Sequence, residues 1–441
     1  MPSTADFTPS EIELLYARGV SMMTVEKLWR VGTMAFLLAF ILVAYHSGGT
    51  IQQPAAGAAT VYEGARIIIG DGRPAIENGS ILVQGGRIVQ AGRAADVRVP
   101  AGATRVSLTG KTVMPTIIDA HVHLSTNREA LIEDLRRRAY FGISAALSLG
   151  LDAGDLAFQV RGETLPGLAR LRTAGRGITS PEQGRTEVPY WITTDQEARK
   201  AVQELSAKKV DIVKIWVDDR NGAYKRLSPE LYGPVIDEAH KNSLRVVAHL
   251  YALDDAKGLL RAGIDGFAHT VRDKELDDEA IALVKKNPNF VQIPNLPDRG
   301  VVQDYSWLKG SIPDEEVNRV QAAATDRPPV QAAFTILAKN LKKLSDAGVK
   351  IAMGTDGNTP WGPHAEMADM VATGMTPAQV IVAATRTSAE VLKLTDAGTL
   401  EAGKRADFVV LDANPLENIT NTRRISAVYL QGVAVNRQRG Y

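Results

Sequence analysis

Residues 113–124 read VMPTIIDAHVHL, an apolar run that ends in Asp119, His121 and His123. In a β-strand, residues two positions apart point to the same side, so the imidazoles of His121 and His123 can face one metal ion together. A single His-x-His pair is weak evidence, because a lone buried histidine is more often a core side chain with satisfied hydrogen bonds. The pair gains weight from the residues that end the other apolar runs of the chain.

The middle of the chain alternates apolar runs with helical patterns. The predicted strands cover residues 112–119, 144–149, 170–174, 211–217, 244–249, 266–269, 290–294 and 349–355. Eight strand–helix repeats in about 250 residues match the size of a (β/α)8 TIM-type barrel. Short β-like runs bracket this section. We therefore expect an α/β fold, with a small composite β-sandwich domain built from both chain ends.

A doubly wound sheet is the competing architecture, but it does not explain why polar residues end so many strands. The expected domains are an N-terminal extension (1–59), the first part of the β-sandwich (60–112), the barrel (113–395) and the second part of the β-sandwich (396–441).

Residues 31–45 (VGTMAFLLAFILVAY) are uncharged and apolar. The run is short for a membrane-spanning helix, which needs about 20 residues, and it fits the apolar part of a signal peptide better. An uncleaved anchor is the alternative. We therefore expect an exported protein, periplasmic or secreted, or one anchored to the membrane through residues 31–45.

Composition excludes several classes of site. The chain has 441 residues and a net charge of +1, which gives no support for a nucleic-acid partner. It has no cysteine, so disulfides, thiolate metal sites and cysteine nucleophiles are excluded. Any metal ion must be held by His, Asp, Glu or a modified side chain.

Strand ends carry the residues that suggest chemistry. Of the seven histidines, four stand at predicted strand ends, namely His121, His123, His249 and His269, and Asp356 follows the last strand. In a barrel of this type the active site lies at the C-terminal ends of the strands. Imidazole and carboxylate groups are suitable ligands for Zn, Mn, Co or Ni. The pattern therefore predicts a metal site at one mouth of the barrel.

Lys214 interrupts the otherwise apolar strand IVKIWV. Lysine is almost never fully buried without a partner. One interpretation is a lysine at a strand edge whose amine reaches solvent. The functional interpretation is a lysine that faces the metal site.

Together these stretches resemble the amidohydrolase superfamily, in its imidazolonepropionase-like and metal-dependent peptidase (prolidase-like) branch. The resemblance covers about residues 60–436 and rests on VMPTIIDAHVHL, IVKIW, VVAHL, GFAHT, MGTDG and GTLEAGKRADFVVLDANPL. The family usually has glycine where this chain has Thr116, a departure that we expect to affect the backbone only.

The resemblance implies a centre of two divalent metal ions, with zinc as the expected metal. The implied ligands are His121, His123, Lys214, His249, His269 and Asp356. Two of the histidines, His121 and His123, would hold the more buried ion with Asp356, and the other two the more exposed ion. Lys214, carboxylated by CO2, would bridge the two ions. Asp356 would also serve as general acid and base.

Substrate selectivity is expected from the loops after the strands. Tyr224 is a candidate hydrogen-bond donor to the oxyanion, and Arg172 or Arg220 a candidate for binding a substrate carboxylate. Three further substrate contacts are expected, from Trp216, Asn295 and His364.

The expected function is metal-dependent hydrolysis of a C–N bond in a small amide or peptide substrate, such as a dipeptide or an N-acyl amino acid. A cyclic-amide hydrolase of the imidazolonepropionase type is the first alternative. A ligand-binding protein without activity is the second. A homo-oligomer is compatible with each of these functions.

Overall fold

The computed structural model describes residues 57–296 and 299–437. The apolar run 31–45, on which the export prediction rests, lies outside them. None of the helices in the described ranges is both long and apolar enough to cross a membrane.

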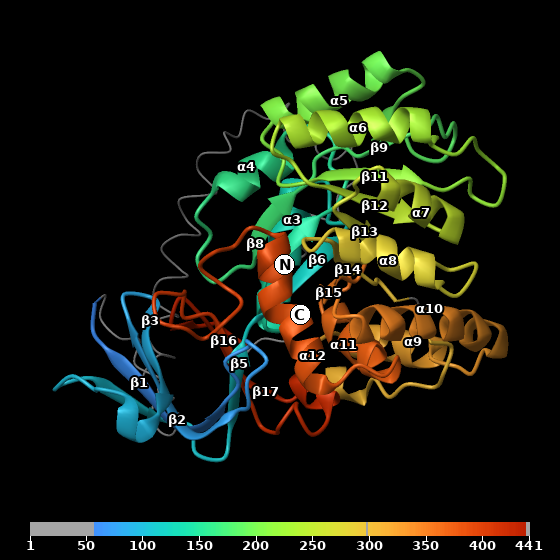
Figure 1. The fold of residues 1–441 in the computed structure, drawn as a ribbon. Coiled ribbons are helices and arrows are strands. Elements are labelled where there is room, and N and C mark those ends of the chain that lie inside the picture. The colour runs from blue at the N-terminus through green and yellow to red at the C-terminus, as the bar shows by residue number, and fades with distance from the viewer. Residues whose placement is uncertain (1–56, 297–298, 438–441) are drawn as a thin grey trace, which may run out of the picture. The chain divides into compact units, whose positions relative to one another are not determined.

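The central section is a barrel of parallel strands (Figure 1). Its strands are β6 (Ile117–Val122), β7 (Ile143–Ser148), β8 (Arg170–Thr173), β11 (Val213–Val217), β12 (Val246–Leu250), β13 (Gly266–Ala268), β14 (Val291–Ile293) and β15 (Lys350–Ile351). Two short strands, β9 (Ile178–Thr179) and β10 (Tyr190–Trp191), extend the sheet beside β11. The barrel strands form two sheets, one of β6, β7 and β8 and the other of the remaining strands. Backbone hydrogen bonds close the barrel between them: Ala120 N donates to Met353 O (2.9 Å), and Asp211 N donates to Thr173 O (3.0 Å). The expected TIM-type barrel is confirmed.

Helices follow the strands and cover the outside of the barrel. They are α3 (Arg128–Tyr140), α4 (Leu156–Gly162), α5 (Asp195–Ala207), α6 (Pro229–Lys241), α7 (Leu253–Arg261), α8 (Asp278–Lys286), α9 (Asp314–Ala323), α10 (Pro328–Asp346), α11 (Gly362–Ala372), α12 (Pro377–Val382) and α13 (Ser388–Val391). A π-helical turn (Ala383–Thr387) joins α12 to α13. Helix α5 begins with the capping box of Thr194 and Glu197, in which each side chain satisfies a free backbone N–H of the first turn.

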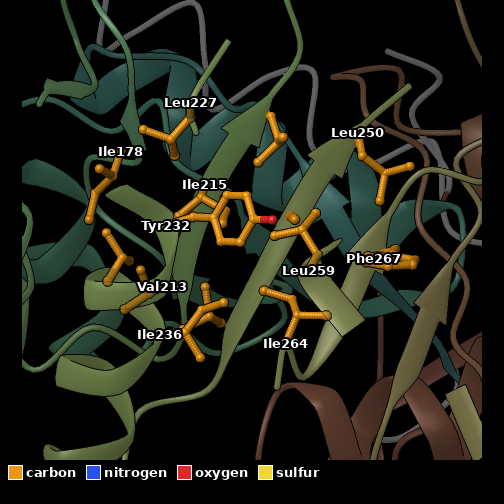
Figure 2. Packing of buried hydrophobic residues seen from close by; sticks show 14 of the residues in the cluster. Ile178, Val213, Ile215, Leu227, Tyr232, Ile236, Leu250, Leu259, Ile264 and Phe267 are labelled. Carbon is orange, nitrogen blue, oxygen red and sulfur yellow. The ribbon is translucent and has the colours of Figure 1, made fainter. Parts of the chain in front are cut away.

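The packing of β11 against these helices decides which of its side chains face the barrel axis. Val213, Ile215 and Val217 join the core cluster between the strands and helices α5 to α8, part of which Figure 2 shows. Each fully buried aliphatic side chain stabilises the fold by about 1.5–3 kcal/mol, so this orientation is strongly preferred. Because side chains alternate along a strand, Lys214 and Trp216 must point to the barrel interior.

A further sheet combines strands that precede the barrel in the amino-acid sequence with strands that follow it. It contains β1 (Thr60–Ile67), β2 (Ile76–Gln84), β3 (Arg87–Arg93), β4 (Thr104–Ser107), β5 (Thr112–Pro115), β16 (Phe408–Leu411), β17 (Ile425–Leu430) and β18 (Val433–Ala434), all connected by hydrogen bonds. Tyr62 on β1 and Tyr429 on β17 are separated by three strand spacings, about 14 Å in a flat sheet. Their rings nevertheless lie 5.0 Å apart. The sheet therefore curves strongly and encloses its own core, as a sandwich does. The described residues cluster as one compact unit, and the domain boundaries stay predictions.

The predicted strand 112–119 is two strands in different sheets, and in this the prediction was wrong. β5 pairs with β16 in the composite sheet, and β6 pairs with β7 in the barrel. Pro115 has no N–H to continue a ladder, so the chain changes sheets after it. Thr116, which stands where the family usually has glycine, is buried and donates from Oγ1 to Ser144 Oγ (2.7 Å).

Candidate metal centre

Four imidazoles and one carboxylate meet at the C-terminal mouth of the barrel. They come from β6 and the residue after it, from β12, from the residue after β13 and from the segment after β15, and they are His121, His123, His249, His269 and Asp356. The backbone of His269 has a φ of 124°, a value that residues other than glycine rarely adopt. Strain of this kind costs about 1–3 kcal/mol and is found mainly at functional sites.

Asp356 lies at the centre of the group. Its Oδ1 is 3.0 Å from His121 Nε2 and 2.9 Å from His123 Nε2, and its Oδ2 is 3.2 Å from His269 Nε2. His121 Nε2 is buried and forms no aligned hydrogen bond, despite its short distance to the carboxylate. Donor atoms of His121, His269 and Asp356 all lie within 4.8 Å of one another. Buried donor atoms that converge without hydrogen-bond partners fit a metal site.

Burial keeps the imidazoles of His121, His249 and His269 neutral. It lowers the pKa of His121 to about 3 and the pKa of His249 to about 4, and it holds the pKa of His269 well below its usual value. Burial alone would raise the pKa of Asp356, but the neighbouring histidines outweigh it and hold that pKa far below its usual value. Neutral imidazole and ionised carboxylate are the forms that bind metal ions.

Lys214 faces the same cavity and is fully buried. Its Nζ has no hydrogen-bond partner, and it lies 5.3 Å from the centre of the Trp216 ring. Burial lowers the pKa of Lys214 to about 7. Gly177 makes room for the Trp216 ring, since a Cβ there would lie 2.0 Å from Trp216 Cζ3. The interpretation of Lys214 as a lysine at a strand edge whose amine reaches solvent is therefore wrong.

The cavity has a volume of about 380 Å³, within the range of sites for small molecules. The histidines, Asp356 and Lys214 form part of its lining. Trp216 also lines the cavity and adds an apolar surface to it, which is consistent with its predicted contact with the substrate. The loop between β9 and β10 supplies a charged wall with Glu182 and Arg185. Sequence reasoning missed this loop, because the two-residue strands that flank it leave no readable pattern.

Asn295 lies behind His121 and is buried, rather than lining the cavity, so its predicted substrate contact is not supported. Its Nδ2 is 2.7 Å from His121 Nδ1, whereas its Oδ1 is buried without a partner. Exchanging the two atoms of the amide, which have nearly the same shape, lets Oδ1 accept from the Nδ1–H of His121. That hydrogen bond places the free lone pair of the ring on Nε2, the atom nearest Asp356.

Replacing Asn295 by Ala is expected to weaken metal binding by about 10- to 100-fold, the usual effect of losing the partner of a ligating histidine. Titration of the metal-loaded enzyme with a chelator measures this affinity. Asn295→Asp keeps an acceptor oxygen and should retain most of it. Asn289→Ala is the matched control, because Asn289 is exposed and lies just before β14, the strand that Asn295 follows. If Asn295→Ala and the control bind metal with equal affinity, Asn295 does not support the metal centre.

A buried ion pair holds two ligand segments together. Arg138 on α3 and Asp119 on β6 are both fully buried, with Nη1 3.5 Å from Oδ2. Asp119 also accepts from Oγ1 of Thr355 (2.8 Å), and Arg138 donates to Gly357 O (3.4 Å). The pair therefore connects the end of β6, which carries His121, to the segment that carries Asp356.

Arg138→Met is expected to lower the free energy of unfolding by about 3–5 kcal/mol, because it leaves the buried carboxylate of Asp119 without its cation. Chemical denaturation followed by circular dichroism measures the change. Arg136→Met, on the exposed side of the same helix, is the control and should cost no more than about 0.5 kcal/mol. A loss at Arg138 as small as that of the control would mean that the ion pair contributes nothing.

Two predicted substrate residues lie away from the cavity, and their prediction is corrected. Arg172 donates from Nε to Leu392 O (3.2 Å) and lies 3.5 Å from Asp211, at the start of β11 and so at the opposite end of the barrel. His364 is buried in the first turn of α11, where Nδ1 contacts Thr422 Oγ1 (3.0 Å) and Nε2 contacts Phe141 O (2.9 Å). Both of its nitrogens have partners, as in an ordinary core histidine.

Tyr224 and Arg220 lie on the loop after β11. Tyr224 donates from its hydroxyl to Gln183 O (3.1 Å), which ties this loop to the charged wall and leaves the hydroxyl outside the cavity lining, so the predicted oxyanion contact is not supported. Arg220 contacts Glu182 (3.2 Å) and Asp218 (2.8 Å) and lies 3.0 Å from His249 Nε2.

Asp218 is a site residue that sequence reasoning missed. Its Oδ2 lies 2.9 Å from His249 Nε2. Lys214, Trp216 and Asp218 follow one another at alternate positions, so the rule that places Lys214 in the barrel could also have found Asp218. Hydrogen bonding to His249 and the charge of Arg220 outweigh its burial and hold the pKa of Asp218 below its usual value.

Comparison with known proteins agrees with this geometry. The model of the amidohydrolase family matches residues 112–435. An imidazolonepropionase from Deinococcus radiodurans is 28% identical over 398 residues, covering 81% of this chain and 92% of that protein. A crystal structure from Bifidobacterium longum, provisionally named a prolidase, has 26% identity and a TM-score of 0.71, covering 88% of this chain and 97% of the other.

A Xaa-Pro dipeptidase with bound methionine in its active site has 22% identity and a TM-score of 0.68, covering 86% of this chain and 99% of the other, which supports the fold. The family match spans well over half of the chain and includes all six predicted ligands. The chain therefore belongs to the amidohydrolase family and is a metal-dependent hydrolase of carbon–nitrogen bonds.

Proposed function

We propose that this hydrolase cleaves the amide bond of a dipeptide or an N-acyl amino acid, at a centre of two zinc ions bridged by carboxylated Lys214. The observation that carries the proposal is the Nζ of Lys214, buried without a partner in the cavity that the histidines and Asp356 line. A bare amine is a poor ligand for two cations at once. Carboxylation supplies two oxygens and a negative charge in its place.

The modification is chemically simple. A neutral Lys214 amine attacks the carbon of CO2, and a C–N bond forms while one C–O π bond of CO2 opens to a negative charge on oxygen. The nitrogen then releases one proton to water, which leaves a carbamate anion. The carbamate would bind both ions. The histidines and Asp356 would divide between them, with His121 and His123 on one ion and His249 and His269 on the other. Each ion would thus have nitrogen and oxygen ligands of the kind that zinc prefers.

Bound divalent ions supply a water of lowered pKa and a Lewis acid for the scissile carbonyl. Asp356 is placed to move the proton, because its side chain is about one-third exposed while its oxygens lie among the imidazoles. It would accept a proton from the attacking water and deliver that proton to the amine nitrogen as the C–N bond breaks. Trp216 would contact the substrate through its apolar face.

The cyclic-amide hydrolase remains the second candidate, favoured by the similarity to imidazolonepropionases. A buried lysine in the fourth barrel strand favours the first candidate. Enzymes of the imidazolonepropionase type typically use a single metal ion without a lysine at this strand, and a single ion has no use for a bridging carbamate. The cavity volume suits either type of small substrate.

The test combines metal analysis with a substrate screen of the purified protein. We expect two equivalents of zinc per chain by mass spectrometry of the metals, and turnover of Xaa-Pro dipeptides or N-acyl amino acids in preference to cyclic imides and lactones. Preference for the cyclic compounds would support the second candidate. A protein that neither carries nor takes up metal and hydrolyses none of these compounds would be a binding protein.

We also propose that residues 31–45 direct export, since the run is apolar, uncharged and short for a membrane span. Cell fractionation with N-terminal sequencing tests this. A mature chain that begins after the run indicates a cleaved leader, and an uncleaved chain in the membrane fraction indicates an anchor. A full-length chain in the cytosol would contradict both.

A further inference from the structure

Three apolar residues belong to the lining of the cavity, namely Leu151, Pro189 and Trp216. Most of the remaining lining consists of the metal-binding groups and of Glu182 with Arg185, which pair with each other. Pro189 and Trp216 are buried, and Leu151 is partly buried. The proposed mechanism gives no role to the leucine or the proline.

Backbone hydrogen bonds bring the segments of these residues together. Gly177 N donates to Gly150 O (2.8 Å), and Tyr190 N donates to Gly177 O (2.7 Å). Leu151 directly follows Gly150, and Pro189 directly precedes Tyr190. The leucine and the proline are therefore supplied by two segments that meet at Gly177.

The ring of Trp216 lies against the same backbone. A Cβ at Gly177 would be 2.0 Å from Trp216 Cζ3, and a Cβ at Gly150 would be 2.7 Å from Trp216 Cη2. Trp216 thus joins Leu151 and Pro189 on one side of the cavity, and we call these three residues the apolar wall. Because the ring also lines the cavity, the two glycines set how much room the apolar wall leaves for a ligand.

The apolar wall and Asp356 lie on opposite sides of the barrel. Trp216 is on β11 and Asp356 follows β15, and the order β11-β12-β13-β14-β15 separates them by four of the eight barrel strands. In the proposed mechanism Asp356 delivers a proton to the amine nitrogen, so the leaving amine lies on its side. The acyl chain extends from the carbonyl carbon away from that nitrogen, and therefore toward the apolar wall.

We propose that the apolar wall binds the acyl group of the substrate and selects amides whose acyl group is an apolar chain or ring. This assignment rests on the proposed function and deepens it, because it names the acid half of the amide. Each methylene that the wall removes from water favours binding. A polar acyl group would lose its water there without gaining a hydrogen-bond partner from leucine, proline or the carbon face of tryptophan.

The experiment varies the acyl group on one amino acid. The metal-loaded full chain is given the acetyl, butyryl and hexanoyl derivatives of the amino acid that the screen favours. It is also given the methoxyacetyl derivative, in which an oxygen replaces one methylene of the butyryl chain. We expect kcat/KM to rise about three- to fourfold for each methylene that is buried, and the butyryl compound to exceed the methoxyacetyl compound. No rise along the series, or a preference for the methoxyacetyl compound, would overturn the proposal.

Gly177→Ala changes the room at the apolar wall. The added methyl pushes the Trp216 ring into the cavity, so the hexanoyl-to-acetyl ratio of kcat/KM should fall about 10-fold, the loss of room for about two methylenes. In Trp216→Leu the ring is absent, and adding Gly177→Ala to that variant should change the ratio little. An equal fall in both backgrounds would mean that the ring does not set the room for the acyl group.

A second variant tests the apolar wall even if Gly177→Ala does not fold. Leu151→Asn keeps the size of the side chain but makes it polar, and it should lower the hexanoyl-to-acetyl ratio about threefold or more. Gly233→Ala, on α6, is the control for the glycine change, because a Cβ there has no neighbouring atom within 4 Å. It should keep the wild-type ratio. A wild-type ratio in Leu151→Asn as well would contradict the proposal.

A second series of substrates keeps the acetyl group and varies the amino acid from glycine to leucine. Gly177→Ala should leave this selectivity for the amine half as it is in wild type. If Gly177→Ala instead alters the amine selectivity and leaves the acyl ratio unchanged, the apolar wall binds the amine half. The proposal is then wrong, while amide hydrolysis stands.

A binding measurement covers failure of the proposed function. If wild type hydrolyses none of these compounds, calorimetry compares the binding of hexanoate and acetate to the purified protein. Tighter binding of hexanoate, weakened by Gly177→Ala, would support the apolar wall without turnover. Equal binding of the two acids, binding of neither, or a preference that Gly177→Ala leaves intact would overturn it.

Discussion

Asp356→Asn will lower kcat for amide hydrolysis by about 10³-fold or more, because proton transfer by a positioned carboxylate contributes about 10²–10⁴-fold and the variant also loses a charged ligand. The asparagine keeps an oxygen in place but cannot take the proton of the attacking water. The contacts of Asp356 with three imidazoles leave no other carboxylate equally placed among the described residues.

Leaving-group dependence separates proton transfer from metal loss. An amide needs a proton on its nitrogen as the bond breaks, whereas a nitrophenyl ester releases a stable phenolate without one. Asp356→Asn should therefore lose more activity on the amide than on the ester of the same acyl group, at a measured metal content. Asp346→Asn, exposed on α10, is the control for a lost surface charge. Equal losses on amide and ester would mean that Asp356 only holds metal.

The parts of the site that could be predicted from sequence are those fixed by strand alternation. Barrel strands are short, buried and bounded by polar residues, so a polar residue at the end of an apolar run is placed at the mouth without knowledge of the partner strands. This is why His121, His249 and Lys214 could be placed from the order of residues alone, and why their neighbour Asp218 could have been.

The errors come from information that a single strand does not carry. Arg172 lies in a correctly predicted strand, but barrel strands are staggered. Thr173 at the end of β8 pairs with Asp211 before the start of β11, so the end of β8 lies level with the beginning of β11. The predicted run 170–174 could not reveal this offset. His364 was placed at the mouth by chain position, but α11 begins at Gly362 and turns the ring into the core.

Lys214→Ala will lose at least one equivalent of metal per chain and most of the amidase activity, because it removes the ligand that is proposed to bridge the two ions. Metal analysis and kcat measured on the same preparation test both effects. Lys350→Ala, an exposed lysine on barrel strand β15 that pairs with Glu390, is the matched control and should keep full metal and activity. Retention of both by Lys214→Ala would remove this residue from the centre.

Truncating a fully buried lysine also leaves a cavity, so loss of function must be separated from loss of the fold. Lys214→Met keeps the aliphatic length and should stay folded, with a thermal unfolding midpoint near that of wild type, yet it should bind metal as poorly as the alanine variant. In Lys214→Ala the vacated space can admit a small acid, so millimolar propionate should restore part of the activity and propylamine should not. A carboxylate that rescues where an amine does not identifies the group at this position as an anion. Rescue by the amine alone would mean instead that the lysine acts as an unmodified amine.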